Sequence, residues 1–153
     1  MILFCDDVPL QDTMIFESAY SNGLKMNIED KREVMMRQFA VWMLLNNQII
    51  GEIYGIPVNN MREQLPGITN SDHGAMYCYS LTILKRWQGS AYGAILLAHW
   101  LGLVKGSGYH RVIAHCRPGG SQALVSKFGG VADCEFPNWY DSGETYRLFR
   151  TTL

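Results

Sequence analysis

The chain has 153 residues, of which 48% are hydrophobic and 18% are charged, and its formal net charge is −1. This length and composition predict a single folded domain over residues 1–153 and exclude an intrinsically disordered chain. A net charge so close to zero gives no electrostatic attraction to nucleic acid or to an anionic membrane, so we expect neither as a partner.

The first third of the chain predicts a strand, two helices and a hairpin. Two apolar runs surround Asn46 and Asn47, and asparagine tolerates the positive φ that a tight two-residue turn requires. Acidic residues early in the second helical pattern, with a basic residue near its end, agree with the helix dipole. The elements predicted here are a strand at 1–5, helices at 10–23 and 27–39, and a hairpin within 40–56.

The segment from Pro57 to Ala75 is polar and rich in turn-forming residues, which predicts a long loop of the kind that is often functional. The elements predicted after it are a strand at 76–84, a helix ending near 105, a strand at 109–116, a short helix within 119–130 and two strands within 131–152. The β-α-β part requires a parallel strand pair with a right-handed crossover. The order predicts an α+β fold, a single mixed sheet of about six to seven strands flanked by about four helices.

The cysteines and the apolar runs indicate the cellular compartment in which the protein is expected. The four cysteines are widely spaced and form no C-x-x-C pair, which favours free thiols in a reducing cytosol over disulfides. The start of the chain has no basic region or cleavage-like site, so we expect no signal peptide. The longest apolar run, residues 94–104, is too short to cross a bilayer. We therefore expect a cytoplasmic protein.

The stretch RWQGSAYGAILLAHW, residues 86–100, changes from a turn with two glycines to a long apolar helical pattern. The first amide groups of a helix have no partner within the helix, and the helix dipole makes this end positive. A glycine-containing turn leading into such a helix lets several N–H groups converge on one anion, and a diphosphate suits that geometry. Lys85 and Arg86 lie at the start of this turn, which contains no carboxylate, so the pattern indicates an anion-binding turn.

The residues around this turn resemble the GNAT acetyltransferase superfamily, whose signature is Q/R-x-x-G-x-G/A between the fourth strand and the third helix. Gln88 matches the first position and Gly93 the last, whereas Ala91 replaces the usual middle glycine. The likeness continues through LTIL, AILLAHWLGLVKGSGYHRVIAHC and ALVSKFGGV, and it covers roughly residues 48–153. The six matched positions are Gln88, Gly89, Ser90, Ala91, Tyr92 and Gly93.

The resemblance implies a GNAT-like acyl-CoA N-acyltransferase fold in which strands four and five splay apart. Acetyl-CoA would be the acyl donor, with its pyrophosphate on the turn amides and its pantetheine arm paired with the backbone of strand four. The implied activity is direct transfer of the acetyl group to a primary amine of a small molecule or a protein, with a homodimer as a further option. The implied cofactor-binding residues are Leu81, Thr82, Ile83, Arg86, Gln88, Gly89, Ser90, Ala91, Tyr92 and Gly93.

The resemblance is weaker in the catalytic residues. In many GNATs a tyrosine on the late helix protonates the departing CoA thiolate, and the aligned residue here is Val125, which has no proton to donate. A base or a water relay must take a proton from the acceptor amine, because a protonated amine has no lone pair. The candidates are Glu52 on strand three, Tyr79 on strand four and His73 on the preceding loop.

Two other functions remain as alternatives. Val125 and Ala91 favour a non-catalytic GNAT-like protein that binds acyl-CoA or serves in assembly or interaction. A nucleotide-binding protein is the third alternative, but the turn lacks the Walker lysine and Ser/Thr pair, and no acidic residue follows at the distance a ribose requires. His110 and His115 are five residues apart, with no cysteine or carboxylate at metal-ligand spacing, so we expect no metal.

Overall fold

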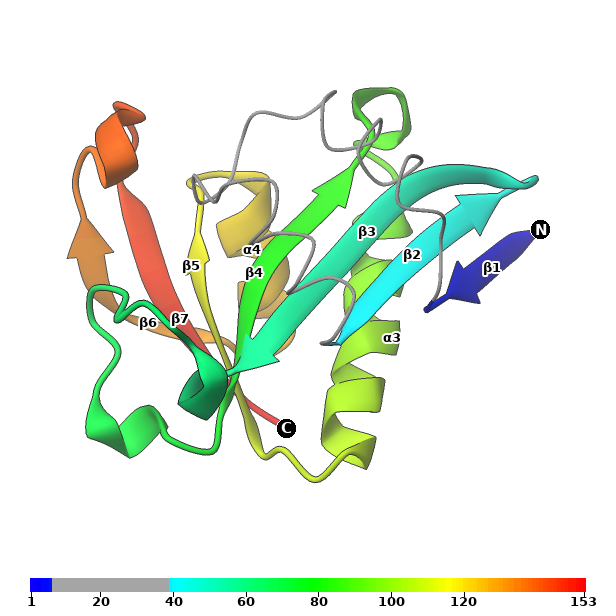
Figure 1. Cartoon of the computed structure of the whole chain (residues 1–153). Helices are drawn as coiled ribbons and strands as arrows, with labels where there is room; N and C mark the ends of the chain where they lie inside the picture. The colour runs from blue at the N-terminus through cyan, green and yellow to red at the C-terminus, as the bar shows by residue number, and fades with distance from the viewer. Residues whose placement is uncertain (7–38) are drawn as a thin grey trace. The chain divides into compact units, whose positions relative to one another are not determined.

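The structure is a computed structural model that describes residues 1–6 and 39–153 (Figure 1). From residue 40 on, its elements follow the predicted order. The predicted helix at 10–23, and the one at 27–39 apart from Phe39, lie outside the described residues. The strands are β1 (Ile2–Cys5), β2 (Ala40–Leu45), β3 (Gln48–Pro57), β4 (Met76–Ile83), β5 (Arg111–Cys116), β6 (Val131–Phe136) and β7 (Tyr146–Thr152), and the helices are α3 (Tyr92–Gly106) and α4 (Gly120–Lys127).

The described strands form one mixed sheet in the order β1-β2-β3-β4-β5-β7-β6. β4 and β5 are parallel, pairing Met76 with Val112 and Tyr77 with Ile113, as the β-α-β pattern requires. β2 is antiparallel to β1 and β3, and β7 is antiparallel to β5 and β6. The predicted α+β fold with a single mixed sheet is therefore confirmed, whereas the splaying of β4 from β5 stays a prediction.

The chain divides into two compact units. The first comprises Met1–Gly55 and Tyr79–Gly102, and the second comprises Ile56–Cys78 and Leu103–Leu153. β4 and α3 contribute residues to both units, and a single domain over residues 1–153 stays a prediction. Among the described residues, no helix has the length and apolar character needed to cross a membrane.

In the first unit, α3 lies against one face of the hairpin formed by β2 and β3 (Figure 1). Asn46 and Asn47 form the hairpin turn with φ values of 50° and 65°, which confirms the predicted tight turn. The closest approach is at Gly51, where a Cβ would lie 2.6 Å from Ile83 Cδ1 and 3.3 Å from Leu96 Cδ2. Large side chains fill this core, namely Trp42, Met43, Ile50, Ile53, Leu96 and Trp100.

In the second unit, β5, β7 and β6 are paired and α4 contacts β7. Gly130, just before β6, lets the end of α4 approach closely, because a Cβ there would lie 2.5 Å from Val125 Cγ1. Consecutive residues are buried on β4, β5 and β7, so side chains on both faces of these strands are covered. The buried residues include Met76, Tyr77, Val112, Ile113, Leu148 and Phe149.

The long loop of the second unit is fixed by a buried carboxylate. Asp72 has 0% exposure. Its two oxygens accept hydrogen bonds from Arg150 Nε and Nη2, both at 2.9 Å, and from the Thr69 amide at 2.8 Å. Arg111 Nη2 adds an ion pair at 3.2 Å. Because Arg150 lies on β7 and Arg111 on β5, the predicted loop is tied to the strands of its own unit.

Candidate functional site

The turn between β4 and α3 is held by side-chain and backbone bonds. Lys85–Trp87 form a single 3₁₀ turn, and the Leu84 amide donates to the Ile50 carbonyl at 2.9 Å. Gln88, the first residue of the matched signature, donates from Nε2 to the Ile83 carbonyl at 2.8 Å. This bond gives the glutamine at position 88 a structural role, because it ties the turn to the last residue of β4.

Gly89 supplies the backbone conformation that the turn needs. Its φ is +79°, and a Cβ built there would meet no atom of residues 1–6 or 39–153 within 4 Å. Gly89 is also exposed, so a ligand could reach this position. Ala91 is not among the described non-glycine residues with positive φ, so the replacement of the middle glycine causes no backbone strain. The turn therefore tolerates the one departure from the signature.

The first turn of α3 presents amide groups ahead of the helical ladder. The Ile95 amide donates to the Ala91 carbonyl at 3.0 Å, which marks the start of the α-helical bonds. The amides before residue 95 lie at the N-terminal end of the helix. They have no acceptors within the helix, and the helix dipole favours an anion there. Residues 88–91 are exposed, so an anion could reach these groups.

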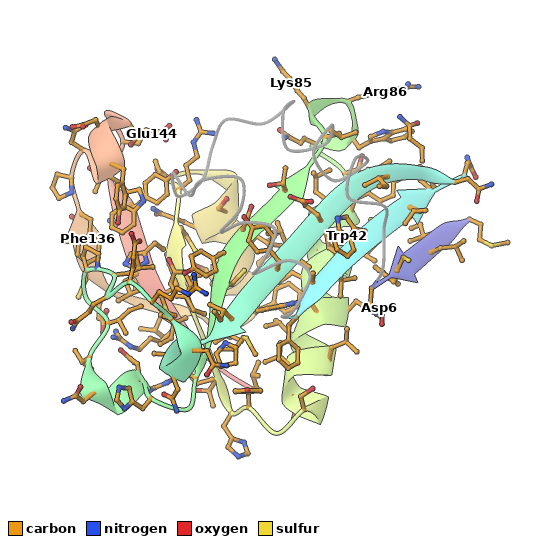
Figure 2. The ribbon with its side chains drawn as sticks, in the orientation of Figure 1. Asp6, Trp42, Lys85, Arg86, Phe136 and Glu144 are labelled. Carbon is orange, nitrogen blue, oxygen red and sulfur yellow. The ribbon has the colours of Figure 1, made fainter. Side chains whose placement is uncertain are left out.

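Two cations stand next to this helix start. Lys85 and Arg86 are exposed, and Figure 2 shows both side chains extending outward from the turn. The Arg86 guanidinium carbon lies 5.0 Å from the Trp87 ring centroid, and Trp87 meets Tyr92 edge to face at 5.9 Å. Arg86 is thus positioned partly by an aromatic surface.

The CoA site that the resemblance implies predicts that removing either charge weakens CoA binding by about 1 kcal/mol or less, since both cations are exposed. The effect of Lys85→Gln or Arg86→Gln should shrink as salt rises, because exposed charges are screened. Isothermal titration of CoA at low and high salt measures this, with Lys127→Gln as a control far along the sequence. A loss that does not change with salt would mean damage to packing instead.

β4 changes the direction of its side chains near the turn. Tyr79 stacks on Tyr54 with ring centroids 6.2 Å apart, whereas Ile83 lies against Gly51. Tyr54 and Gly51 are three residues apart on β3, so they face opposite sides of the sheet. Tyr79 and Ile83, which contact them, therefore also face opposite sides, although residues four apart on a regular strand would share one side. The side chains of β4 therefore depart from strict alternation between Tyr79 and Ile83.

The segment Leu81–Ile83 is the one that the resemblance assigns to the pantetheine arm, and it ends β4. Thr82 and Ile83 are buried, at 6% and 7% exposure, and Leu81 is half-buried. Ser80 and Thr82 are joined by their hydroxyl groups at 3.1 Å. The apolar side chains belong to the core, so only the backbone of this segment is offered to a ligand.

The three candidate bases lie in different surroundings. Glu52 is 1% exposed, and its Oε2 accepts a hydrogen bond from Trp42 Nε1 at 3.2 Å. Tyr79 is half-buried and shares the Tyr54 face of the sheet with Glu52 in the first unit. His73 belongs to the second unit, is exposed, and lines a groove of about 350 Å³ within the long loop.

The position of the family's acid holds a packing residue. Val125 Cγ1 and the Thr151 hydroxyl both crowd the point where Gly130 would carry a Cβ, at 2.5 Å and 3.0 Å. The adjacent hydroxyl of Ser126 donates to the Gln122 carbonyl at 2.8 Å within α4. Neither residue therefore presents a proton donor poised to protonate a thiolate.

A hydrogen-bonded pair of Tyr77 and the half-buried His115 was missed by the sequence analysis. His115 Nδ1 lies 2.6 Å from the Tyr77 hydroxyl, and Nε2 lies 2.7 Å from the Pro66 carbonyl. Trp139 stacks on the imidazole ring at 4.3 Å, and Phe136, labelled in Figure 2, meets its edge at 5.3 Å. The sequence offered one signal for this pair, because Tyr77 and His115 fall on strands that are predicted to be parallel neighbours.

The proton of His115 can be placed from these contacts. A carbonyl oxygen only accepts hydrogen bonds, so Nε2 carries the proton and Nδ1 accepts from the Tyr77 hydroxyl. Burial lowers the pKa of His115 to about 4, which keeps the imidazole neutral at pH 7. The described residues contain no group of three or more histidine, cysteine or acidic side chains that could hold a metal ion.

Comparison with known proteins identifies the fold. No family model and no curated protein sequence matches the chain. Among solved structures, it is similar to the loading GNATL domain of CurA from Lyngbya majuscula (16% identity, TM-score 0.74, 99% of this chain and 98% of that one). It is also similar to the ribosomal-protein-S18-alanine N-acetyltransferase from Escherichia coli (11%, 0.75, 99% and 94%).

A third similar structure contains a ligand. It is Arabidopsis thaliana Naa50 in complex with the bisubstrate analogue CoA-Ac-MVNAL (15% identity, TM-score 0.71, 99% of each chain). These identities are low, but the matches extend over nearly the whole length of both chains. The likeness inferred from the turn at residues 88–93 is therefore confirmed at the level of the fold, and this protein has the GNAT fold.

Proposed function

We propose that this protein is an N-acetyltransferase that moves the acetyl group of acetyl-CoA directly to a primary amine. The observation that carries the proposal is the open turn at Gly89, tied to β4 by Gln88 and leading into the N-terminus of α3. Support also comes from the shared fold, since one similar structure holds a bisubstrate analogue that contains CoA.

The turn would hold the pyrophosphate and β4 the pantetheine arm. Backbone amides at the start of α3 would bind the phosphate oxygens, with Arg86 and Lys85 adding charge. The last residues of β4 would offer their backbone to the amide groups of the pantetheine. The proposed set is Leu81, Thr82, Ile83, Arg86, Gln88, Gly89, Ser90, Ala91, Tyr92 and Gly93.

Two protons must leave the acceptor nitrogen during transfer. The first leaves the ammonium form before attack, because only the neutral amine has a lone pair. We assign this step to a water chain ending at Glu52, Tyr79 or His73. The CoA thiol resembles free cysteine, with a pKa of about 8.5, so its thiolate can leave without a donor at position 125.

The proposal is tested by binding first and by turnover second. Titration with acetyl-CoA and with desulfo-CoA should show saturable binding of both. A panel of amines, including peptide N-termini, a lysine side chain and small diamines, is then assayed by release of the CoA thiol. Thiol release that depends on one amine class identifies the acceptor as a small molecule or a protein. The absence of CoA binding would reject the proposal.

Gly89→Val is expected to reduce CoA affinity at least about tenfold while the fold persists. Valine at a φ of +79° costs about 1–2 kcal/mol and alters the direction of the turn amides, but it meets no neighbouring atom. Gly108→Val is the matched control, with a φ of +95° and open space around it. Both variants should lose similar stability in thermal melts. Equal CoA affinity in the two variants would contradict the assigned turn.

A non-catalytic acyl-CoA-binding or assembly protein is the second candidate function, and Val125 at the family's acid position favours it. Binding of acetyl-CoA without thiol release from any amine would support it. Cytoplasmic localisation is also a proposal, supported by the wide spacing of the four cysteines. A homodimer is a further proposal, which light scattering after gel filtration would check.

A further inference from the structure

We propose that Trp87, together with Arg86 and Tyr92, forms the binding site for the adenosine 3′-phosphate end of CoA. The inference rests on the proposed acetyltransferase function and extends it to a part of the donor that lies beyond the pyrophosphate and the pantetheine arm. All three residues belong to the first unit, and Trp87 contacts both of the others. The sequence analysis assigned no role to Trp87.

The two aromatic rings lie on either side of Gly89 in the sequence. Trp87 ends the 3₁₀ turn Lys85–Trp87, and its amide donates to the Leu84 carbonyl at 2.8 Å. Tyr92 is the first residue of α3. The ring centroids are 5.9 Å apart and the ring planes are nearly perpendicular, at 88°, which is an arrangement that aromatic pairs favour. The pair therefore spans the segment whose amides would bind the pyrophosphate.

Trp87 differs in its exposure from the other tryptophans. The chain has four tryptophans, and Trp42, Trp100 and Trp139 are only 2%, 0% and 6% exposed. Trp87 is half-buried. Its Nε1 atom is buried and has no hydrogen-bond partner among residues 1–6 and 39–153, so the exposed surface of the indole is ring carbon. Flat apolar surface beside an exposed turn is suited to stacking against another ring.

Arg86 adds positive charge to this aromatic surface. Its guanidinium carbon lies 5.0 Å from the Trp87 ring centroid, and the residue is exposed. Nucleobases stack on aromatic rings and on guanidinium planes, because every base has a π-face. A guanidinium also binds phosphate oxygens through charge-assisted hydrogen bonds. Residues 85–93 contain two cations and no acid, so this segment suits a ligand that combines a purine ring with a phosphate.

The covalent structure of CoA brings both of these groups to the turn. The pantetheine arm and the adenosine are attached to opposite ends of the pyrophosphate. With the pyrophosphate at the start of α3 and the arm along Leu81–Ile83, the adenosine leaves the turn on the side opposite the arm. Only a ribose separates the adenine from the pyrophosphate, so the ring stays near the turn, whose aromatic residues are Trp87 and Tyr92. The same ribose carries the 3′-phosphate, for which Arg86 supplies charge.

This site would make the chain selective for one class of acyl donor. A thioester of free CoA carries the adenosine 3′-phosphate, whereas a thioester on the phosphopantetheine of a carrier protein lacks it. The arm is the same in both donors, so the backbone of β4 cannot distinguish them. Stacking on Trp87 would therefore favour free acyl-CoA as the donor.

The test compares CoA, 3′-dephospho-CoA and 4′-phosphopantetheine by isothermal titration of the whole chain. Trp87→Leu should lower the affinity for CoA and for 3′-dephospho-CoA about tenfold, because both contain adenine and the loss of base stacking has an effect of this size. Its affinity for 4′-phosphopantetheine should equal that of the wild type. Trp87→Phe keeps an aromatic face and should lose less affinity than Trp87→Leu.

Arg86→Gln separates the phosphate from the base. It should lower the affinity for CoA by no more than about fivefold, and most of this loss should disappear with 3′-dephospho-CoA, which lacks the 3′-phosphate. Lys127→Gln, in the second unit, should bind all three probes as the wild type does. An Arg86→Gln loss of the same size for CoA and 3′-dephospho-CoA would reject the assignment of the 3′-phosphate.

The outcomes at position 87 separate this inference from the proposed function. A wild type that does not bind CoA would reject both together. Wild-type affinity of Trp87→Leu for CoA would reject only the inference. The inference also fails if Trp87→Leu loses as much affinity for 4′-phosphopantetheine as for CoA, since that would mean damage to the turn.

Fluorescence of the wild-type chain keeps the proposal testable if the variants fold poorly. Because the other three tryptophans are buried, Trp87 is the one that acrylamide reaches most easily. Saturation with CoA or 3′-dephospho-CoA should protect the tryptophan emission from acrylamide, and saturation with 4′-phosphopantetheine should not. Acrylamide quenching that is unchanged when CoA is bound would overturn the assignment of Trp87.

Discussion

Asp72→Asn is expected to lower the free energy of unfolding by about 3 kcal/mol, the typical cost of removing one partner from a buried ion pair. The carboxylate has 0% exposure and binds Arg150 through two hydrogen bonds of 2.9 Å. An amide keeps the shape but leaves Arg150 and Arg111 facing a neutral group. Urea unfolding of the two proteins at pH 7 measures the difference.

The free energy of unfolding that Asp72→Asn loses depends on pH in a defined direction. Hydrogen bonds from Arg150 lower the pKa of Asp72 below its usual value of 3.8, even though burial acts in the opposite direction. The contribution of the ionised group is therefore fully present above pH 3.8 and is lost as the pH falls through the lower folded value. The gap between wild type and Asp72→Asn should be constant from pH 8 to 5 and should close in acid.

Asp133→Asn is the matched control for this prediction. Asp133 also pairs with Arg150, but its side chain is 53% exposed, so its removal should cost about 1 kcal/mol or less. Equal losses for the two variants would mean that burial does not determine the strength of the network. A normal stability for Asp72→Asn would mean that the loop is not held by this carboxylate.

The sequence predicted those features that depend on neighbouring residues. The Asn46–Asn47 turn and the strand and helix ranges after residue 39 follow from local pattern and turn chemistry. The glycine turn before α3 was also accessible, because Gly89 has the positive φ that only glycine adopts freely. Local signals of this kind also located the proposed cofactor site.

The sequence could not reveal contacts that depend on register and distance. Asp72 in a polar loop is typical of a solvated residue, and its partner Arg150 is 78 positions away. The pairing of Tyr77 with His115 depends on how two strands align across 38 positions. The contact of Tyr79 with Tyr54 depends on how β4 lies against β3. These features arise from tertiary packing, so single-residue patterns give no sign of them.

Ala91 illustrates how the structure changes the weight of a sequence argument. At the sequence level it counted against CoA binding, because alanine resists positive φ. In the structure the positive φ falls at Gly89 and not at Ala91, so the departure is conformationally neutral. Val125 is different, because its side chain packs beside Gly130 and no hydroxyl replaces the missing donor there. The case for a binding protein therefore rests on Val125 alone.

Loss of the first-proton base is expected to lower turnover at least tenfold and to remove the rise of activity with pH that its deprotonation produces. Glu52→Gln, Tyr79→Phe and His73→Ala are assayed from about pH 6 to 9, with acetyl-CoA affinity measured alongside. Glutamine can still accept from Trp42 Nε1, and phenylalanine can still stack on Tyr54, so these changes remove proton transfer and little else. His73 is exposed, so alanine is tolerated there.

Trp42→Phe is the complementary control, because it removes the 3.2 Å hydrogen bond and leaves the carboxylate in place, whereas Glu52→Gln keeps an acceptor for that bond and removes the carboxylate. If Glu52 is the base, its limb of the pH profile is lost in Glu52→Gln and remains in Trp42→Phe. If none of the three variants changes turnover tenfold, the water chain ends at another residue. A wild type that binds acetyl-CoA but acetylates no amine would instead make Val125 decisive, since a chain without a donor at 125 and without turnover is a binding protein built on an acetyltransferase fold.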